Sequence, residues 1–407
     1  MPTPTMLHSL AVVVMKVLYY CEEYYCNHGG RTHAREFFAA LQNLHGVTHA
    51  SIFPGAKNIA PKRDGIEKKR GKLRFLPTAL QTFVRCFIPR SALVKQLEKE
   101  IRAGKYDCLL IRASFQRNLM LGRLKKSLPD IVLVLEINSA YFDEKFHAIW
   151  LRKLWQWVEA GRYKRADRII VVSSYLKDYL VGRGVPDEKI CVNPNGVNPT
   201  LFDHQTSVKK TMLRRQLGIP DDAFVLGYVG GMEPFRRLNE VVERFAEMRR
   251  QGNNTLYLLL VGDGEDMPRV TAAIDSHRAV LTGWTQCLGW QPYELIPQMI
   301  SAFDVAIMPF TNPYCSPLKL FEYLAMGVPT MGPDTPAVRE VVEDGVHLRL
   351  VNQDGSNFSD VVSELKNSPH IRRRLAMEGQ RWVLENHTWE KNAERVMEHV
   401  RSARNSV

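Results

Sequence analysis

The chain has 407 residues, of which 45% are hydrophobic and 24% are charged, and its formal net charge is +12. This length is sufficient for two domains that each bury an apolar core. No apolar run approaches the roughly 20 residues that span a bilayer, and the seven cysteines have no regular spacing. The composition therefore excludes an integral membrane protein, a disulfide scaffold and a zinc module.

The positive charge lies in the first half of the chain. Residues 1–195 carry more Lys and Arg than Asp and Glu, whereas the remainder is close to neutral. This asymmetry indicates two domains that face different partners. A basic first domain favours an anionic membrane surface or an acidic acceptor, with nucleic acid as a further alternative. The irregular cysteines fit a reducing compartment, so we expect a cytoplasmic protein.

Short apolar runs alternate with amphipathic stretches throughout the first half. Buried strands are predicted at 12–20, 108–113, 131–138 and 168–173, and helices at 34–44 and 91–104. This alternation is typical of a doubly wound parallel sheet with helices on both faces. The second half repeats it, with strands predicted at 224–230, 256–264, 304–310 and 328–333. We therefore expect an α/β protein with two Rossmann-like domains.

The domain boundary is expected near 196–210, where Pro, Gly and Asn replace the periodic apolar residues. We assign residues 1–200 to a first domain and 201–385 to a second. The last helix, at about 386–407, is expected to pack back on the first domain.

Ligands of such sheets bind beyond the carboxyl ends of the strands, so the loops there carry the candidate residues. Gly29 and Gly30 follow the first strand and would let the backbone approach a ligand, although a simple turn explains them equally well. Glu136 and Asn138 end a later strand and point to one side. They are candidates for contact with a substrate, or a pair that bonds only to the next loop.

The basic segments of the first half have two interpretations. The stretch at 143–165 carries three Trp residues among Lys and Arg, and could lie on a membrane surface. We favour the alternative, a helix with one core face and one solvated face. The basic run at 57–74 has no apolar periodicity, which shows only that it is not core.

Residues 314–334, YCSPLKLFEYLAMGVPTMGPD, predict a helix whose start is suited to an anion. Ser316 is expected to cap it and Pro317 to take the first helical position. The free N–H groups of Leu318 and Lys319, with the Lys319 ammonium, would then bind a phosphate. Glu322 shares their face and would accept hydrogen bonds from sugar hydroxyls. An ordinary capped core helix is the alternative.

This stretch resembles the nucleotide-sugar motif of glycosyltransferase family 4, and the similarity continues through PAVREVVEDG at 336–345. The segments at 166–202, 228–245 and 287–304 also resemble that family, so the likeness covers most of the chain. It implies the two-domain GT-B fold, with the domains facing each other across a cleft. The family usually has two Glu separated by seven residues. Here Glu322 is the second, and Tyr314 takes the place of the first.

The resemblance also assigns roles to loop residues of both halves. In the family an Arg and a Lys after the first strand of the second domain hold the leaving diphosphate. Arg236 stands at the Lys position, Gly231 stands at the Arg position, and Arg237 is a neighbouring candidate. The other implied contacts are Gly262 and the pair Trp290 and Gln291 with the nucleotide, Gly29 and Gly30 with donor phosphate or acceptor, and Glu136 and Asn138 with the reacting sugar.

The implied reaction is transfer of a sugar from a nucleoside diphosphate to an acceptor hydroxyl, with retention of anomeric configuration. Its partners would be a nucleotide-sugar donor and a lipid-linked, saccharide or other small acceptor in polysaccharide or glycolipid synthesis. Peripheral contact with the inner membrane face would fit the basic first domain, and neither nucleic acid nor a metal or other cofactor is expected. A sugar-nucleotide epimerase of the same fold and a non-catalytic binding relative are the alternatives.

Overall fold

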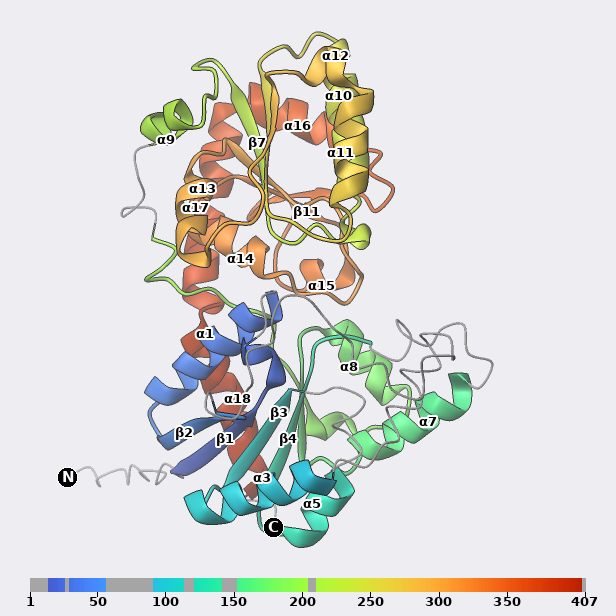
Figure 1. The fold of residues 1–407 in the computed structure, drawn as a ribbon, viewed down its shortest axis with the longest axis vertical. Coiled ribbons are helices and arrows are strands. Elements are labelled where there is room, and N and C mark those ends of the chain that lie inside the picture. Colours follow the sequence, from blue (N-terminus) through green and yellow to red (C-terminus); the bar gives the residue numbers. More distant parts are fainter. Residues whose placement is uncertain are drawn as a thin grey trace, which may run out of the picture.

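The computed structural model describes residues 14–25, 29–55, 91–112, 121–140, 152–203 and 210–404. Two six-stranded parallel sheets organise this part of the chain, one in each half (Figure 1). The predicted α/β architecture of two doubly wound domains is therefore confirmed. The basic run at 57–74 and the start of the stretch at 143–165 lie outside the described residues.

The first sheet has the strand order β2-β1-β3-β4-β5-β6. Its strands are β1 (Met15–Tyr20), β2 (Val47–Phe53), β3 (Cys108–Arg112), β4 (Val132–Ile137), β5 (Arg168–Val171) and β6 (Ile190–Val192). The central strands are continuous apolar runs because helices cover both faces of the sheet. These helices are α1 (Gly29–Asn43), α3 (Ser91–Gly104), α5 (Leu121–Ser127), α7 (Arg152–Tyr163) and α8 (Ser174–Val181).

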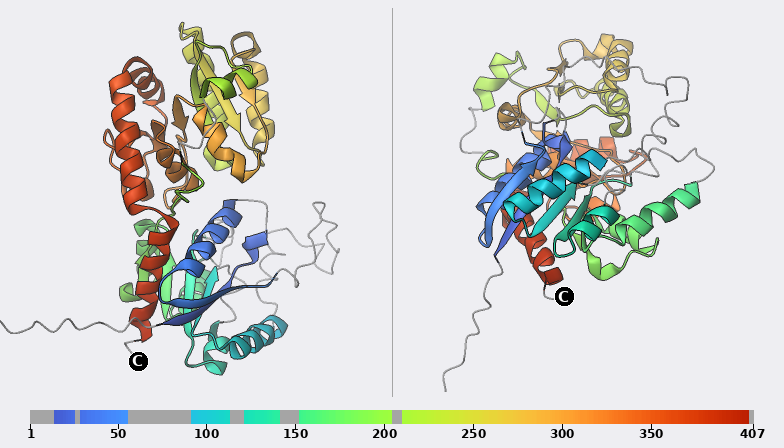
Figure 2. Two further views of the ribbon diagram at one scale, coloured as in Figure 1. Left: turned by 90° about the vertical axis from the view of Figure 1, so that its left-hand side faces the viewer. Right: turned by 60° about the horizontal axis from the view of Figure 1, so that its bottom comes forward.

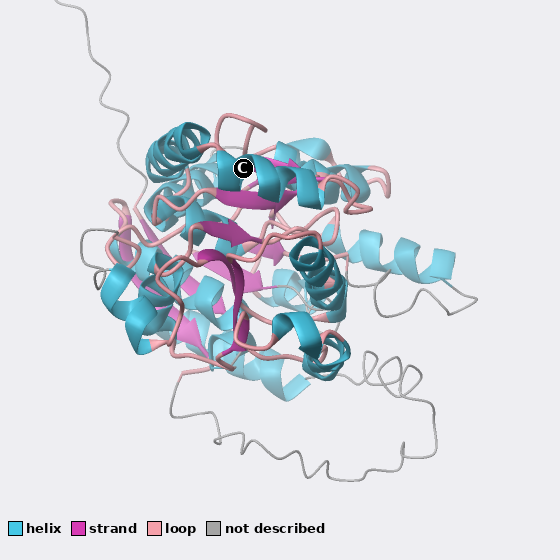
Figure 3. Ribbon diagram, turned by 90° about the horizontal axis from the view of Figure 1, so that it is seen from above, coloured by secondary structure: helices cyan, strands magenta, loops and turns pink. Residues whose placement is uncertain are grey.

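The second sheet has the order β12-β11-β10-β7-β8-β9. Its strands are β7 (Phe224–Val229), β8 (Leu256–Val261), β9 (Thr285–Cys287), β10 (Val305–Ile307), β11 (Thr330–Pro333) and β12 (Arg349–Val351). The order reverses between β7 and β10, so the crevice expected to bind ligands lies at their carboxyl ends. Figure 3 shows the strands between two layers of helices.

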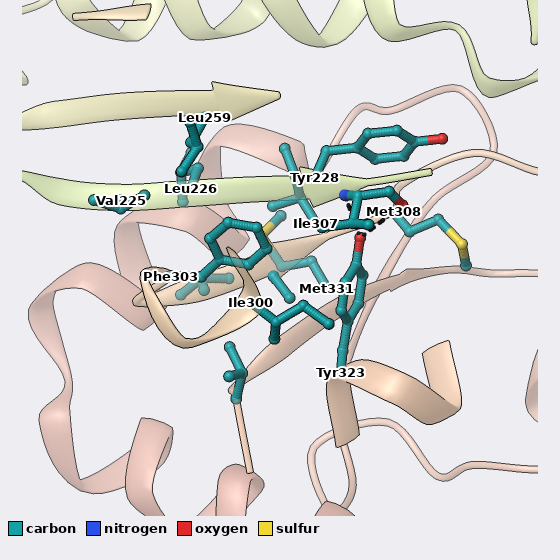
Figure 4. Packing of buried hydrophobic residues seen from close by; sticks show 14 of the residues in the cluster. Val225, Leu226, Tyr228, Leu259, Ile300, Phe303, Ile307, Met308, Tyr323 and Met331 are labelled. Atoms are coloured by element: carbon teal, nitrogen blue, oxygen red, sulfur yellow. Dashed lines mark hydrogen bonds between the residues drawn. The ribbon is translucent and has the colours of Figure 1, made fainter. Parts of the chain in front are cut away.

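The helices of the second domain point their apolar faces toward the core of that domain. They are α9 (Lys210–Gln216), α10 (Leu238–Arg250), α11 (Met267–Ser276), α12 (Arg278–Leu281), α13 (Ile296–Ser301), α14 (Leu318–Ala325), α15 (Pro336–Arg339), α16 (Phe358–Asn367) and α17 (Pro369–Asn386). In the core, Phe303 and Tyr323 pack beside the central strands (Figure 4). The Tyr323 hydroxyl accepts a hydrogen bond of 2.7 Å from the Val229 amide, which fixes α14 to the end of β7.

The last helix, α18 (Trp389–Arg404), lies against the first domain (Figure 2). Its buried residues Trp389, Val396 and Met397 share an apolar cluster with Tyr19 of β1 and Phe37 of α1. The chain thus crosses between the domains twice, near residues 193–203 and near 387–389. The Asn392 side chain joins the two crossings by donating a 2.7 Å hydrogen bond to the Pro194 carbonyl. Among the described residues, no helix is both long and apolar enough to cross a membrane.

Candidate functional site

The start of α14 is the centre of the candidate site. Helix α14 begins at Leu318 with Pro317 as its N-cap, so Pro317 stands one position earlier than predicted. The prediction that Ser316 caps the helix is wrong, because its hydroxyl instead accepts a 2.9 Å hydrogen bond from the Asn195 amide of the inter-domain crossing. The predicted apolar stripe is confirmed, since Leu320, Phe321, Leu324 and Ala325 are buried. The helix also ends as predicted, with Gly327 at a φ of 62°.

Lys319 is a buried cation held over an aromatic ring. Its Nζ donates a 2.6 Å hydrogen bond to the Tyr228 hydroxyl and lies 4.2 Å from the centroid of that ring. Gly230, just after β7, has a φ of 132°, and a Cβ there would lie 2.4 Å from this Nζ, so a side chain at 230 would strain the backbone and displace the ammonium. Burial, and then the charge of Arg236, lower the pKa of Lys319 well below its usual value. An anion bound in this place would favour the charged ammonium of Lys319 and would also be attracted to Arg236.

Arg236 is positioned by the loop after β10. It ends the short 3-10 helix Pro234–Arg236, and its Nη1 donates a 2.8 Å hydrogen bond to the Thr311 hydroxyl. Among the described residues, neither Arg236 nor Lys319 forms an ion pair with a carboxylate. Both charges are therefore available to a ligand.

Arg237 is directed elsewhere. It adopts a left-handed conformation with a φ of 50°, pairs with Glu240 at 2.5 Å and donates a 2.6 Å hydrogen bond to the Gln353 carbonyl. Arg237 is therefore already engaged with Glu240 and Gln353, and its contact with a phosphate stays a prediction.

Glu322 lies one turn along the same helix face as Lys319 and is 6% exposed. Its Oε1 accepts a 3.0 Å hydrogen bond from the Tyr293 hydroxyl. Burial raises the pKa of Glu322 to about 7, even though Tyr293 and Lys319 favour its charged form. This carboxyl group is therefore poised to change charge near neutral pH, and it can accept hydrogen bonds from a polyol once ionised.

The glycine-containing loops after β7 and β8 lie against each other. A Cβ on Gly262 would be 2.0 Å from the Gly230 carbonyl oxygen, so Gly262 allows the close contact. Gly231 has more open surroundings, because an added Cβ would meet nothing nearer than a Glu233 carboxylate oxygen at 3.6 Å. The absence of an Arg side chain at 231 thus leaves space beside the two cations.

The residues predicted to meet the base flank this region. Trp290 is 65% exposed, which rules out the core position that was its alternative. Gln291 donates a 3.0 Å hydrogen bond to the Leu288 carbonyl. Both remain candidates for nucleotide contact.

Glu136 at the end of β4 is fully engaged within the first domain. Its Oε1 lies 2.6 Å from His33 Nε2 and 2.6 Å from Arg112 Nη1, and it also accepts a hydrogen bond from Asn138. Its Oε2 accepts a 2.8 Å hydrogen bond from Tyr19. Burial opposes ionisation, but the charges of His33 and Arg112 hold the pKa of Glu136 well below its usual range.

This network changes the role we expected for the strand end. Glu136 and Asn138 share a hydrogen bond, and the Glu136 carboxylate is held by the surrounding network. The buried Asn138 Oδ1, in contrast, has no hydrogen-bond partner among the described residues, so Asn138 stays a candidate for contact with the sugar. Gly29 and Gly30 are the first residues of α1. We had expected them in the loop before that helix.

Tyr314 also differs from its expected place near the donor. Its ring packs in the apolar cluster of the first domain, 6.3 Å from the Tyr175 ring, and its carbonyl accepts a 2.9 Å hydrogen bond from Ser173. It therefore connects the two domains. Sequence reasoning missed His33, Tyr228 and Tyr293. Among the described residues, no three His, Cys, Asp or Glu side chains gather as a metal site.

Comparison with known proteins agrees with this arrangement. Residues 28–201 match the family model described as Glycosyltransferase Family 4, and residues 223–368 match Glycosyl transferases group 1. The chain belongs to glycosyltransferase family 4. The gap between the two matches, residues 202–222, falls between β6 and β7, where the first sheet ends and the second begins.

Individual relatives are distant. The family 4 chain is 23% identical to alpha-D-kanosaminyltransferase of Streptomyces kanamyceticus, over 60% of this chain and 64% of that protein. It is 28% identical to D-inositol 3-phosphate glycosyltransferase of Stackebrandtia nassauensis, over 52% of this chain and 48% of that protein. The alignments thus span about half to two thirds of these relatives.

The fold of the whole chain is that of GT-B glycosyltransferases. The crystal structure of Anabaena HepE in complex with UDP-glucose superposes with a TM-score of 0.70, at 17% identity, over 95% of this chain and all of that one. The GT-B prediction is confirmed.

Proposed function

We propose that this protein transfers a sugar from a nucleoside-diphosphate sugar to an acceptor hydroxyl. The observation that carries the proposal is the pair of cations at the start of α14, Lys319 and Arg236, which form no ion pair with a carboxylate in the described part of the chain. Glycosyl transfer from a nucleotide sugar leaves a diphosphate, whose growing negative charge must be stabilised. Fixed cations in a partly dry site do so without reorganisation. The binding of UDP-glucose by HepE, a protein of the same fold, supports this donor class.

The donor would be oriented along α14. We place the diphosphate against the Leu318 and Lys319 amides, where the helix dipole favours an anion. Glu322, one turn further, would accept hydrogen bonds from the hydroxyls of the nucleoside ribose. Ionised Glu322 is the better acceptor, so donor binding is expected to favour its charged form.

The proposed product keeps the anomeric configuration of the donor, as the family resemblance implies. The acceptor we propose is a saccharide or lipid-linked hydroxyl of polysaccharide or glycolipid synthesis, reached from the cytoplasm by a protein that can contact the anionic membrane surface. The basic residues Arg123, Lys126 and Arg165, which line one depression of the first domain, support that contact.

The first experiment compares two adjacent arginines. Arg236→Gln should abolish most of the thermal stabilisation that UDP or GDP gives the wild-type protein, because a ligand stabilises only in proportion to its affinity for the folded state. Loss of one charge-assisted contact should weaken binding by roughly 1.5–3 kcal/mol. The matched control, Arg237→Gln, removes the same charge one residue away and should leave the stabilisation intact.

Two outcomes would contradict the proposal. One is the absence of stabilisation of the wild type by any nucleoside diphosphate at millimolar concentration, which would favour a non-catalytic relative. The other is an equal loss in the two variants. If a donor is bound and its sugar is epimerised without any acceptor, the epimerase alternative replaces the transferase.

A further inference from the structure

A chain of buried hydrogen bonds joins the strand end of the first domain to the start of α14. His33 of α1 contacts Glu136 of β4 through Nε2 at 2.6 Å and the Asn195 Oδ1 through Nδ1 at 2.6 Å. Asn195 in turn donates its backbone N–H to the Ser316 hydroxyl at 2.9 Å and its side-chain amide to the Ser316 carbonyl at 2.5 Å. All four residues are buried, with exposures of 4–8%.

The hydrogen-bond partners of His33 determine which of its ring nitrogens carry protons. The Asn195 NH2 group is directed to the Ser316 carbonyl, so the oxygen of the same amide faces His33 and can only accept. On the other side of the ring, the Glu136 carboxylate is also an acceptor. Both ring nitrogens must therefore donate, and only the imidazolium form of histidine has two donors.

The surroundings of the ring are consistent with a fixed cation. Glu136 supplies the opposite charge, and Arg112 from β3 and Tyr19 from β1 bind the same carboxylate. The Trp389 ring of α18 meets the imidazole edge to face at 5.0 Å, and Phe37 of α1 packs at 6.0 Å. These side chains restrict the rotation of His33, so its two bonds set the place of Asn195.

We propose that His33, as an imidazolium, is a positioning residue that fixes the start of the donor helix α14 relative to the first domain. Its Nδ1–H holds the Asn195 side chain in the orientation that donates to the Ser316 carbonyl, and so keeps the Asn195 backbone N–H beside the Ser316 hydroxyl, two positions before α14. Without the second ring proton, the contact with Asn195 or the contact with Glu136 is lost. The consequence for turnover rests on the proposed function, because α14 is the helix that would hold the leaving diphosphate.

One readout requires no substrate. Hydrogen exchange at the Asn195 amide reports its bond to Ser316 directly. In the ligand-free His33→Gln variant, this amide should exchange at least about tenfold faster than in the wild type. The reason is that a glutamine side chain cannot donate to Glu136 and Asn195 at once from the positions of the two ring nitrogens. Phe37→Leu is the matched control, since Phe37 packs on the His33 ring from the same helix but takes no part in the hydrogen bonds that join Glu136, His33, Asn195 and Ser316. It should leave the exchange rate near the wild-type value.

The second readout separates positioning from general stability. The turnover number of His33→Gln should fall about tenfold to hundredfold, as expected for a displaced reacting group. In nitrogen NMR of the wild-type protein, both ring nitrogens of His33 should carry a bonded proton, a signature that a merely structural role would not require.

Asn195→Asp provides a second variant if His33→Gln does not fold. Aspartate can still accept a hydrogen bond from His33 but cannot donate one to the Ser316 carbonyl. We therefore expect the same fall in turnover number and the same faster exchange of the backbone amide of residue 195. Unchanged exchange at that amide, or a ring nitrogen of His33 that carries no proton, would overturn the inference. Failure of the wild type to bind any nucleoside diphosphate would instead overturn the proposed function, and leave the exchange result as a separate test of the His33 contact.

Discussion

At the scale of single residues, burial of Glu322 has a measurable effect on stability. Its pKa is raised from 4.5 to about 7 in the folded protein. Between these pH values the folded state binds more protons than the unfolded state, so stability decreases as the pH rises. The penalty begins near the unfolded pKa and is complete above the folded pKa.

Glu322→Gln removes this penalty, because glutamine does not ionise. Relative to the wild type, the variant should gain up to roughly 3 kcal/mol of unfolding free energy between pH 4.5 and 8. Urea denaturation of both proteins at several pH values measures the difference. Parallel pH curves would show that Glu322 has no raised pKa. The same substitution should weaken nucleotide binding, so stability and function are expected to change in opposite directions at this residue.

At the scale of elements, the contact between the loops after β7 and β8 depends on Gly262. This residue has a φ of 134°, and an added Cβ would be 2.0 Å from the Gly230 carbonyl oxygen. Gly262→Ala must therefore separate the two loops or strain the backbone, and should lower the unfolding free energy by roughly 2–4 kcal/mol.

Gly218→Ala is the control for backbone conformation alone. Gly218 also has a positive φ, 69°, but nothing lies within 4 Å of its added Cβ. It should cost only about 1 kcal/mol. Equal losses in the two variants, measured by chemical denaturation, would show that the contact between the loops is not what requires glycine at 262.

The elements that sequence could predict are those with a strong local pattern. The central strands and α14 were recognised because their apolar runs and stripe are visible within a single window. Strand β2 was missed because polar and apolar residues mix in VTHASIF, and β6, β9 and β12 have only three residues each. Short edge strands are defined by their pairing partner and not by their own composition.

The candidate site was predictable to the same extent. Lys319, Glu322 and Arg236 lie in local motifs, and the structure places them together at the start of α14. The partners that orient them come from far along the chain, as Tyr228 does for Lys319 and Tyr293 does for Glu322. The predicted Ser316 cap was wrong for the same reason, since Asn195 binds that hydroxyl from 121 residues away.

At the scale of the whole molecule, the positive charge for the leaving group comes from the chain itself. Lys319, Arg236 and the start of α14 are the groups we propose to neutralise the diphosphate. Sugar transfer should therefore persist within about twofold in the presence of excess EDTA, because fixed cations already supply the stabilisation. A measured loss of turnover that is restored by Mg²⁺ or Mn²⁺ would show that a divalent cation takes part.

The two domains touch through several polar contacts near this site. Ser174 of α8 donates from its backbone N–H to Glu340 at 2.8 Å, and its hydroxyl donates to the same carboxylate at 2.8 Å. Tyr314 and Ser316 add the contacts described above. These bonds fix the relative position of the domains near the helix that would hold the donor.

The return of α18 to the first domain affects the order in which the molecule can be completed during synthesis. Trp389, Val396 and Met397 fill a cluster that also contains residues of β1 and α1, so the first domain lacks part of its core until the last helix emerges. At about 5–20 residues per second, synthesis of the second domain takes on the order of ten to forty seconds. During that interval Tyr19 and Phe37 lie beside an unfilled apolar surface. The first domain to be translated is thus the last to be finished, and the nascent chain would be a substrate for chaperones that shield apolar surface.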